Sequence, residues 1–264
     1  MSGRRAARLA PSLLLLGIAA FALLWLARAP EPEARLAGFA TRLEGRSRGQ
    51  RHNALLSARS LNGAVVPPGG AFSFNGRVRS WSADAGYVKA PVSFDGELIP
   101  AFGGGVCQTS TTLYNAALLA GLGVAERHHH VFAPHYVAPG RDAAVAYPNI
   151  DLRLTNPYPF PVRVAARADG DQLVVEVWGR RASAEKVVLQ SRLLAVERPG
   201  TAVQQRAPSG PGARRFVRSA AATGYRVVTY RVKTREGREV RRERLSDDSY
   251  PAMPRVLRYS DGSR

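Results

Sequence analysis

Cysteine and acidic residues are scarce in this sequence. Among 264 residues Cys107 is the single cysteine, and 20 Asp and Glu residues stand against 38 Lys and Arg residues. One cysteine excludes an intramolecular disulfide. The sequence also lacks a CxxC pair and an HExxH motif, so we expect neither a metal ion nor another cofactor.

The charge balance is strongly positive. The formal net charge is +18, and nearly all of the positive side chains are arginine. Such a protein attracts anionic lipid headgroups, anionic wall polymers, acidic peptides or nucleic acid. The arginines are scattered and no nucleic-acid-binding motif accompanies them, so we expect no nucleic acid partner. A solvated basic surface without a specific partner is the alternative.

The N-terminus has the pattern of an export signal. Three arginines among the first eight residues precede an uncharged apolar stretch over residues 9–27, close to the roughly 20 residues that cross a bilayer. The cleavage site at residues 27–29 is poor because Arg28 is bulky. We therefore predict an uncleaved signal anchor with a cytoplasmic tip over residues 1–28. The rest of the chain would lie outside, as a membrane-anchored, extracytoplasmic protein of the cell envelope.

Composition divides the remaining chain into three parts. Residues 29–59 are weakly helical and rich in arginine, which indicates a juxtamembrane spacer that leads into a helix. A Pro-Pro-Gly-Gly turn at residues 67–70 opens the main part, expected over residues 60–180. Proline and glycine between residues 199 and 212 indicate a linker, so residues 181–264 are expected to form a linker and a small β tail.

Local patterns predict one helix among strands. Alternating apolar residues flank Asp-Gly turns at residues 95–96 and 169–170 and predict two β-hairpins. Residues 106–120 form the best helical segment, which Gly121 ends as a C-cap. β patterns return over residues 225–245. The predicted class is therefore α+β: one central helix packed on antiparallel strands, with an N-terminal transmembrane helix and a small C-terminal β tail.

Cys107 opens this predicted helix directly after three glycines. A helix N-terminus favours negative charge, so a thiol there ionises more easily than a free one. The backbone N–H groups of Cys107 and Gln108 are candidate donors to an oxyanion. His130 is the candidate base and Asp142 the candidate orienting carboxylate, in the chain order of papain-like and transglutaminase-like enzymes. We therefore predict Cys107, His130 and Asp142 as catalytic residues.

Thr111 and Tyr114 share the side of the predicted helix that carries Cys107, and both are polar enough to line a cleft. Two other interpretations stay open. A small thiol after glycines is also typical of a tight packing site. The histidines at positions 128, 130 and 135 would share one face of an extended segment, which makes them the alternative metal ligands.

Residues 103–118, GGGVCQTSTTLYNAAL, resemble the signature of the VanW family of vancomycin B-type resistance accessory proteins. Blocks at residues 72–75, 86–92 and 126–143 resemble further family motifs in the same order. The resemblance covers about residues 60–180. It implies an envelope setting and an association with cell-wall biology, without a settled reaction.

Two functions remain open at this point. The first is a Cys-dependent acyl transferase or amidase that acts on peptidoglycan or an envelope protein. The alternative is a non-enzymatic module that binds the cell wall or has a structural role there. The tail over residues 225–254 is similar to small modules that often follow VanW domains and are thought to bind wall sugars. The expected partners are therefore cell-wall polymer or an envelope protein, and the membrane through the N-terminal helix.

Overall fold

In the computed structural model, the described residues are 32–94, 97–180, 185–206, 210–211, 214–219, 221–260 and 262–263. One compact unit begins at Ala34, and the features below belong to it. The predicted signal anchor of residues 1–28 lies outside the described residues. Within the described part of the chain, no helix is long and apolar enough to cross a membrane.

The fold is mostly β, so the predicted α+β class is wrong. Strands make up 47% of the structure and helices 16%; three helices lie in the described residues, and the predicted transmembrane helix is not among them. Strand β1 (Ala34–Arg42) stands where a weakly helical spacer was predicted, and strand β10 (Lys186–Glu197) where a linker was predicted. Both strands are stabilised by pairing with strands that are distant in the sequence. The local amino-acid composition contains no signal of such pairing.

A four-stranded antiparallel sheet forms one side of the core, in the order β1-β9-β8-β2. Strands β8 (Val162–Asp169) and β9 (Gln172–Gly179) form the hairpin predicted around residues 169–170, and β2 (Val65–Val66) pairs with β8. Alternate residues of the hairpin point into the core, as the sequence pattern predicts. The buried ones are Val162, Val164, Ala166, Leu173, Val175 and Val177.

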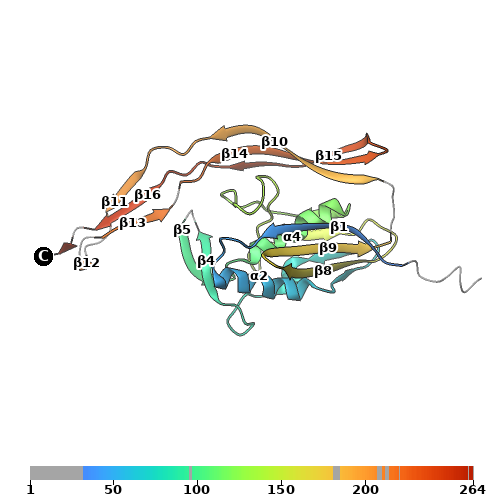
Figure 1. Ribbon diagram of the computed structural model, residues 1–264, viewed down its shortest axis with the longest axis horizontal. Helices are drawn as coiled ribbons and strands as arrows, with labels where there is room; N and C mark the ends of the chain where they lie inside the picture. Colours follow the sequence, from blue (N-terminus) through green and yellow to red (C-terminus); the bar gives the residue numbers. More distant parts are fainter. Residues whose placement is uncertain are drawn as a thin grey trace, which may run out of the picture. The chain divides into compact units, whose positions relative to one another are not determined.

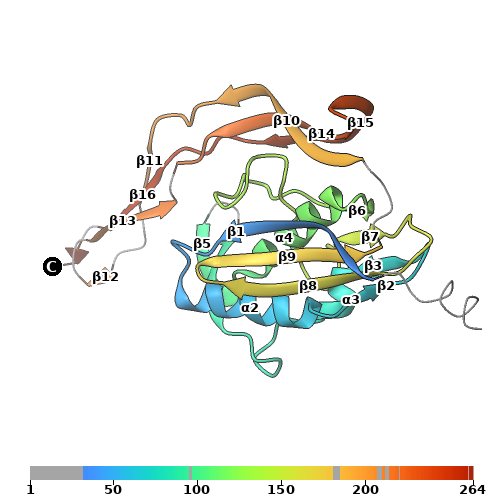
Figure 2. The ribbon, with the colours of Figure 1, turned by 45° about the vertical axis from the view of Figure 1, so that its right-hand side comes forward.

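The central helix α4 (Val106–Leu119) confirms the predicted helix to within one residue. It packs against the sheet and beside helix α2 (Arg48–Leu61), as Figures 1 and 2 show. Nearly all of its side chains are buried, including a run of hydroxyl groups that find hydrogen-bond partners. Thr112 bonds Thr41 of β1 at 2.9 Å, and Ser57 of α2 donates to Thr109 at 2.8 Å. Each such bond contributes about 1 kcal/mol, so polar contacts as well as apolar packing fix α4.

Smaller elements complete the core domain, by which we mean residues 34–180. Strands β3 (Ala71–Ser73), β7 (Arg153–Thr155) and β6 (Gly123–Glu126) form a second sheet in that order, and β3 leads into helix α3 (Phe74–Val78). Strands β4 (Lys89–Phe94) and β5 (Glu97–Phe102) confirm the other predicted hairpin.

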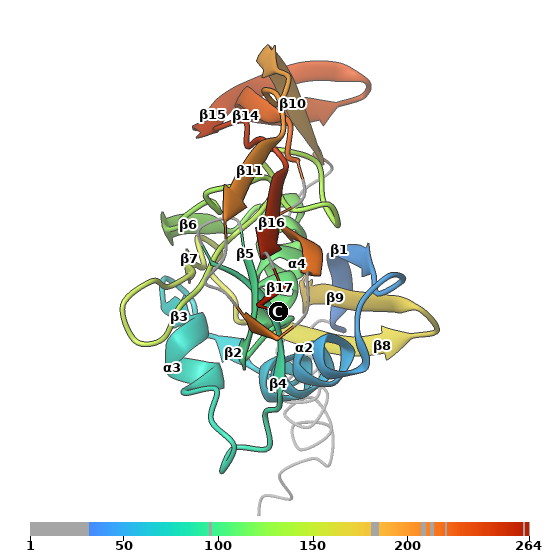
Figure 3. The same ribbon diagram turned by 90° about the vertical axis from the view of Figure 1, so that its left-hand side faces the viewer.

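The C-terminal sheet consists of β10, β14 (Gly224–Arg235) and β15 (Arg238–Tyr250), antiparallel in that order. These strands are 12 to 13 residues long and lie within residues 181–264, which were expected to form a linker and a small β tail. The sheet contacts the core domain: Arg231 donates to the Leu122 carbonyl at 2.6 Å, and Figure 3 shows β14 and β15 beside β6 and its following loop. The shorter strands are β11 (Val203–Arg206), β12 (Gly210–Pro211), β13 (Arg214–Ser219), β16 (Val256–Ser260) and β17 (Gly262–Ser263).

Three glycines allow α4 to begin in close contact with α2 and β4. Gly103 and Gly105 have positive φ angles of 84° and 108°. A Cβ on Gly104 would lie 2.7 Å from the Pro91 carbonyl oxygen, and one on Gly105 would overlap the Gln50 carbonyl oxygen. Any side chain at these positions would push the start of α4 away from its neighbours.

Replacing Gly105 by alanine is expected to lower the free energy of unfolding by about 2–5 kcal/mol, of which about 1–2 is left-handed backbone strain and about 1–3 is overpacking. Gly63→Ala is the matched control, because Gly63 has a φ of 77° and a Cβ there would have no heavy atom within 4 Å. The control should lose only the strain contribution in urea denaturation. Equal losses in the two variants would show that the contact with Gln50 does not constrain the helix start.

Candidate active site

Cys107 lies in the first turn of α4 and is half-buried. Its Sγ donates to the Val145 carbonyl oxygen at 3.4 Å, and the His130 side chain is close enough to interact with it electrostatically. Burial alone would raise the pKa of the Cys107 thiol, but the interaction with His130 and the bond to the Val145 carbonyl outweigh burial and lower it. Cys107 therefore loses its proton at a lower pH than a free cysteine does.

His130 lies on the loop between β6 and β7, between Cys107 and Asp142. Its Nδ1 is 2.6 Å from Asp142 Oδ2, and its backbone N–H donates to the same oxygen at 2.7 Å. Because Nδ1 faces Asp142, Nε2 is the ring nitrogen that faces Cys107. Burial would lower the pKa of His130, but hydrogen bonds with Asp142 and Cys107 raise it to about 10. The ring is thus an imidazolium at neutral pH, and its positive charge favours the thiolate form of Cys107.

Asp142 is completely buried. Its Oδ2 accepts the two bonds from His130, while its Oδ1 accepts from the Tyr250 hydroxyl at 2.5 Å and Arg127 Nη2 at 3.2 Å. Burial would raise the pKa of Asp142, but the hydrogen bonds and charge of His130 hold it at about 2. The segment is tied to α4, since Ser110 donates to the Ala143 carbonyl at 2.6 Å.

The other predicted helix residues lie behind the site instead of lining an open cleft. Gln108 is 2% exposed and donates from Nε2 to Thr41 Oγ1 at 3.0 Å, which ties α4 to β1. Thr111 is 0% exposed and accepts from the Ala143 N–H at 3.0 Å. Tyr114 is 2% exposed, with the Arg127 guanidinium 5.5 Å from its ring centre. These buried side chains support the site through their contacts with β1, Ala143 and Arg127.

The two predicted oxyanion donors differ in availability. The Gln108 N–H donates to the Gly105 carbonyl at 3.1 Å, so it is already paired. The Cys107 N–H has no backbone acceptor among the described residues. Of the two amides, that of Cys107 is the candidate donor to a developing negative charge.

His128 and His52 have partners of their own. His128 Nε2 lies 3.0 Å from Glu126 Oε1, and His52 Nε2 lies 2.8 Å from the Gly86 carbonyl oxygen. His130 faces Asp142 instead. Across the residues that the structure describes, no group of three or more His, Cys, Asp or Glu side chains is placed to hold a metal ion.

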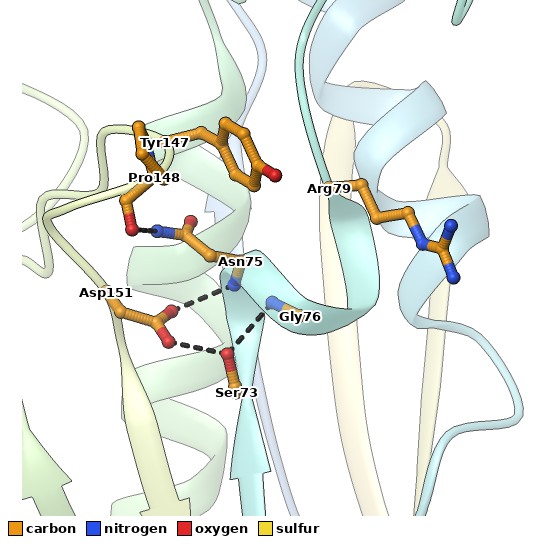
Figure 4. A pocket seen from close by; sticks show the side chains of 7 residues that line it. All are labelled: Ser73, Asn75, Gly76, Arg79, Tyr147, Pro148 and Asp151. Carbon is orange, nitrogen blue, oxygen red and sulfur yellow. Dashed lines mark hydrogen bonds between the residues drawn. The ribbon is translucent and has the colours of Figure 1, made fainter.

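A pocket of about 460 Å³ lies elsewhere, beside the motif at residues 72–75 (Figure 4). Asp151 accepts hydrogen bonds there from the Ser73 hydroxyl at 2.5 Å and the Asn75 N–H at 2.8 Å. These bonds join the segment just before β7 to β3 and α3, so the Asp151 carboxylate has a structural role. The pocket is lined by Ser73, Asn75, Gly76, Arg79, Tyr147, Pro148 and Asp151, and none of the predicted catalytic residues is among them.

Sequence reasoning missed three residues that contact the site. Arg127 donates from Nε to the Asp142 carbonyl at 2.7 Å and from Nη1 to Asp248 Oδ1 at 2.6 Å. Tyr250 bonds Asp142, which lies 108 positions earlier in the chain. Arg127 lies three positions before His130 in the sequence, and this nearness could have identified it. No local signal marks Asp248 or Tyr250, because their pairing depends on the tertiary fold.

Fold and site together define a mostly β domain with a Cys–His–Asp cluster at the start of its buried central helix. Residues 49–178 match the family model described as VanW like protein, and the chain belongs to this family, as the sequence motifs predicted. The uncharacterized protein YoaR of Bacillus subtilis (strain 168) is 36% identical over 144 residues, 54% of this chain and 48% of that protein. The vancomycin B-type resistance protein VanW of Enterococcus faecalis (strain ATCC 700802 / V583) is 30% identical over 132 residues, 48% of each chain. The chain thus spans about half the length of the curated relatives it matches.

Two solved structures also match in part. The IgA1 protease G5 domain structure is 16% identical with a TM-score of 0.18, covering 32% of this chain and 100% of that one. The crystal structure of HP0197-G5 is 16% identical with a TM-score of 0.14, covering 28% of this chain and 96% of that one. Similarity at these TM-scores supports no conclusion about this protein.

The lowered pKa of Cys107 predicts alkylation at an unusually low pH. We expect iodoacetamide to modify the native full chain with a pH midpoint below the ordinary 9.0 of a thiol. His130→Ala should raise this midpoint above that of a free thiol, because burial would then act without the imidazolium. Mass spectrometry of quenched samples measures the rate. A thiol that reacts only after unfolding in urea would identify Cys107 as a packing residue.

The same pair predicts how stability depends on pH. The raised pKa of His130 contributes stability that is complete below about 6.5 and is lost as the pH rises to about 10. The lowered pKa of Cys107 contributes stability that is complete above 9.0 and is lost as the pH falls. Above pH 6.5, and between the lowered pKa of Cys107 and 9.0, the two contributions therefore oppose each other in the wild type.

Cys107→Ala leaves only the histidine contribution, so its free energy of unfolding should fall from about pH 6.5 upward, where the wild type changes little. Urea denaturation at a series of pH values measures both proteins. The Cys107→Ala, His130→Ala double variant is the control and should lose the slope again. Parallel curves for the wild type and Cys107→Ala would contradict the paired ionisation.

Proposed function

We propose that this protein is a cysteine-dependent acyl transferase or amidase, with Cys107 as nucleophile, His130 as general acid and base, and Asp142 as the group that orients the imidazole. The observation that carries the proposal is that one imidazole, that of His130, bonds Asp142 at 2.6 Å and interacts electrostatically with the Cys107 thiol. A nucleophile, a base and an orienting carboxylate in contact are the parts that acyl transfer needs.

The first half of the reaction follows from the protonation states at neutral pH. The Cys107 thiolate attacks the carbonyl carbon of a substrate amide, and a carbon–sulfur bond forms. The imidazolium of His130 then gives its Nε2 proton to the departing nitrogen as the carbon–nitrogen bond breaks. An amine leaves, the acyl group remains on sulfur as a thioester, and His130 is neutral.

The second half decides between the two activities. Water or an amine attacks the thioester carbon, and the neutral His130 ring takes the proton from the attacking group. The carbon–sulfur bond breaks, which restores the thiolate and the imidazolium. Water as the acceptor gives an amidase, and an amine gives a transferase. Asp142 stays ionised throughout, because its pKa of about 2 lies far below that of the ring.

The start of α4 favours the negative charge that develops during attack. The Cys107 N–H has no backbone acceptor among the described residues, so it is free to donate to the substrate oxygen. The dipole of the 14-residue helix α4 acts in the same direction at its N-terminus. Removal of one such donor from an acyl-transfer enzyme typically costs about 10²–10³ in kcat.

The proposed substrate is a peptide amide of the cell wall or of an envelope protein, outside the cytoplasm. Membership in the VanW family favours this setting, and one relative carries the name of a vancomycin resistance protein. The formal charge of +18 would draw the protein toward anionic wall polymers and acidic peptides.

Trapping the thioester tests the proposal directly. The full chain is mixed with soluble peptidoglycan fragments, quenched in acid and examined by intact mass spectrometry for an acyl group that hydroxylamine releases. The wild type should accumulate the adduct on Cys107 and form amide cleavage or transfer products. His130→Gln should slow product formation by about 10²–10⁴-fold, because it removes the proton transfer.

Cys107→Ala is the matched control and should form neither adduct nor product while remaining folded at the pH of the assay. Products at the wild-type rate from Cys107→Ala would overturn the proposal. Binding of the fragments without any adduct or product from the wild type would also overturn it, and would favour the non-enzymatic wall-binding module instead.

A further inference from the structure

The C-terminal sheet contributes a hydrogen bond to the buried carboxylate of the site. The Tyr250 hydroxyl, at the end of β15, donates to Asp142 Oδ1 at 2.5 Å and accepts from the Gly140 N–H at 3.0 Å. The ring of Tyr250 is 2% exposed and makes an edge contact with the His129 ring at 5.1 Å. Tyr250 therefore touches both Asp142 and the loop that carries His130.

A second residue of β15 balances the charge of Arg127. Arg127 Nη1 donates to Asp248 Oδ1 at 2.6 Å, and both side chains are nearly buried, at 8% and 4% exposure. The Ser246 hydroxyl holds the other Asp248 oxygen at 2.8 Å. Arg127 also bonds Asp142, so its guanidinium pairs with two carboxylates. Without Asp248, Asp142 would be its single carboxylate partner among these residues.

The same sheet clamps the backbone just before Asp142. The Thr229 hydroxyl donates to the Gly140 carbonyl at 3.1 Å. A Cβ on Gly140 would lie 2.6 Å from Thr229 Oγ1 and 3.0 Å from a Val227 methyl carbon, so the two backbones approach as closely as glycine allows. Residues 140–142 are thus held between α4 on one side and β14 and β15 on the other.

We propose that Tyr250 and Asp248 are positioning residues of the Cys107 site, so that the thiol is activated only while the C-terminal sheet is docked on the core domain. The proposal rests on the function proposed above and adds a dependence on residues beyond the family match, which ends at residue 178. Neither residue touches the reacting sulfur; both act through the orientation and charge of Asp142.

Each contact has a distinct effect on the His130 ring. Without the Tyr250 hydroxyl, Asp142 Oδ1 keeps only Arg127, and the Gly140 N–H loses its acceptor. Without the Asp248 carboxylate, the buried Arg127 charge is no longer shared and competes with the imidazolium for Asp142. Both changes weaken the interaction of Asp142 with the protonated His130 ring. A smaller fraction of Cys107 is then thiolate at a given pH.

Charged and titratable groups reach Asp142 from every element packed around it. Those that act on Asp142 directly are Cys107 and Tyr114 on α4, Arg127, His130 and Tyr136 on the loop after β6, and Tyr250 on β15. Behind them, Arg46 acts on Tyr136, Arg141 on Tyr114, and Asp248 on Arg127. A change confined to β15 leaves all of the others in place, which makes the β15 variants selective.

The test compares neighbouring substitutions on opposite faces of β15. Asp248→Asn removes the buried carboxylate, whereas Asp247→Asn is its matched control, because Asp247 pairs with Arg226 and Arg244 on the solvent side. Tyr250→Phe removes the buried hydroxyl, and Tyr230→Phe, whose ring stacks under Arg242, is the control in the same sheet. All variants are made in the full chain.

The readouts are the pH profile of Cys107 alkylation and the NMR signal of the His130 ring protons. Asp248→Asn and Tyr250→Phe should each raise the alkylation midpoint by about one pH unit. At a pH below the midpoint, this shift corresponds to about tenfold less thiolate. The two controls should overlay the wild type. Thermal unfolding reports any loss of fold, and the tyrosine variant provides a second route if the aspartate variant does not fold.

A purely structural role for the sheet gives a different result. Tyr250→Phe and Asp248→Asn would then lower the unfolding temperature while the alkylation midpoint and the His130 signals stay at their wild-type values, which overturns the inference. A wild type whose midpoint is that of a free thiol overturns the proposed function itself. The two failures are therefore distinguishable in one experiment.

Discussion

The buried carboxylate of Asp142 is the constraint on which the arrangement of the site depends. A charge that has lost its water must recover hydrogen bonds from the protein, and Asp142 accepts four, two on each oxygen. Two come from His130, one from Arg127 and one from Tyr250. The loop after β6 and the end of β15 must therefore meet around one residue, although they lie far apart in the chain.

The character of α4 follows from the same requirement. A helix that carries a nucleophile at its start would ordinarily expose one polar face, yet α4 is buried along nearly its whole length. Its hydroxyl groups are paired: Thr109 with α2, Thr112 with β1, and Ser110 with the carbonyl after Asp142. The polar side chains of the helix thus bond its neighbours, and Cys107 is the half-buried thiol in its first turn.

Local signals explain which features the sequence could predict. Helix α4 and the β8–β9 hairpin have periodic apolar patterns bounded by glycine turns, and both were predicted closely. Cys107, His130 and Asp142 were grouped from chemistry and chain order, and the structure brings these three together. Strands β1 and β10 were missed because each is stabilised by a partner strand tens of residues or more away, which leaves no mark on its own composition. Tyr250 was missed for the same reason.

The site also explains why a second acidic residue is needed. Arg127 and the His130 imidazolium are two cations that both bond Asp142, and one carboxylate cannot satisfy two buried cations equally. If Arg127 took the larger share, the histidine would lose the negative charge that keeps it protonated, and Cys107 would lose its counterion. Asp248 resolves the competition by binding Arg127 from the other side. A carboxylate supplied by the C-terminal sheet thus leaves Asp142 free to serve the histidine.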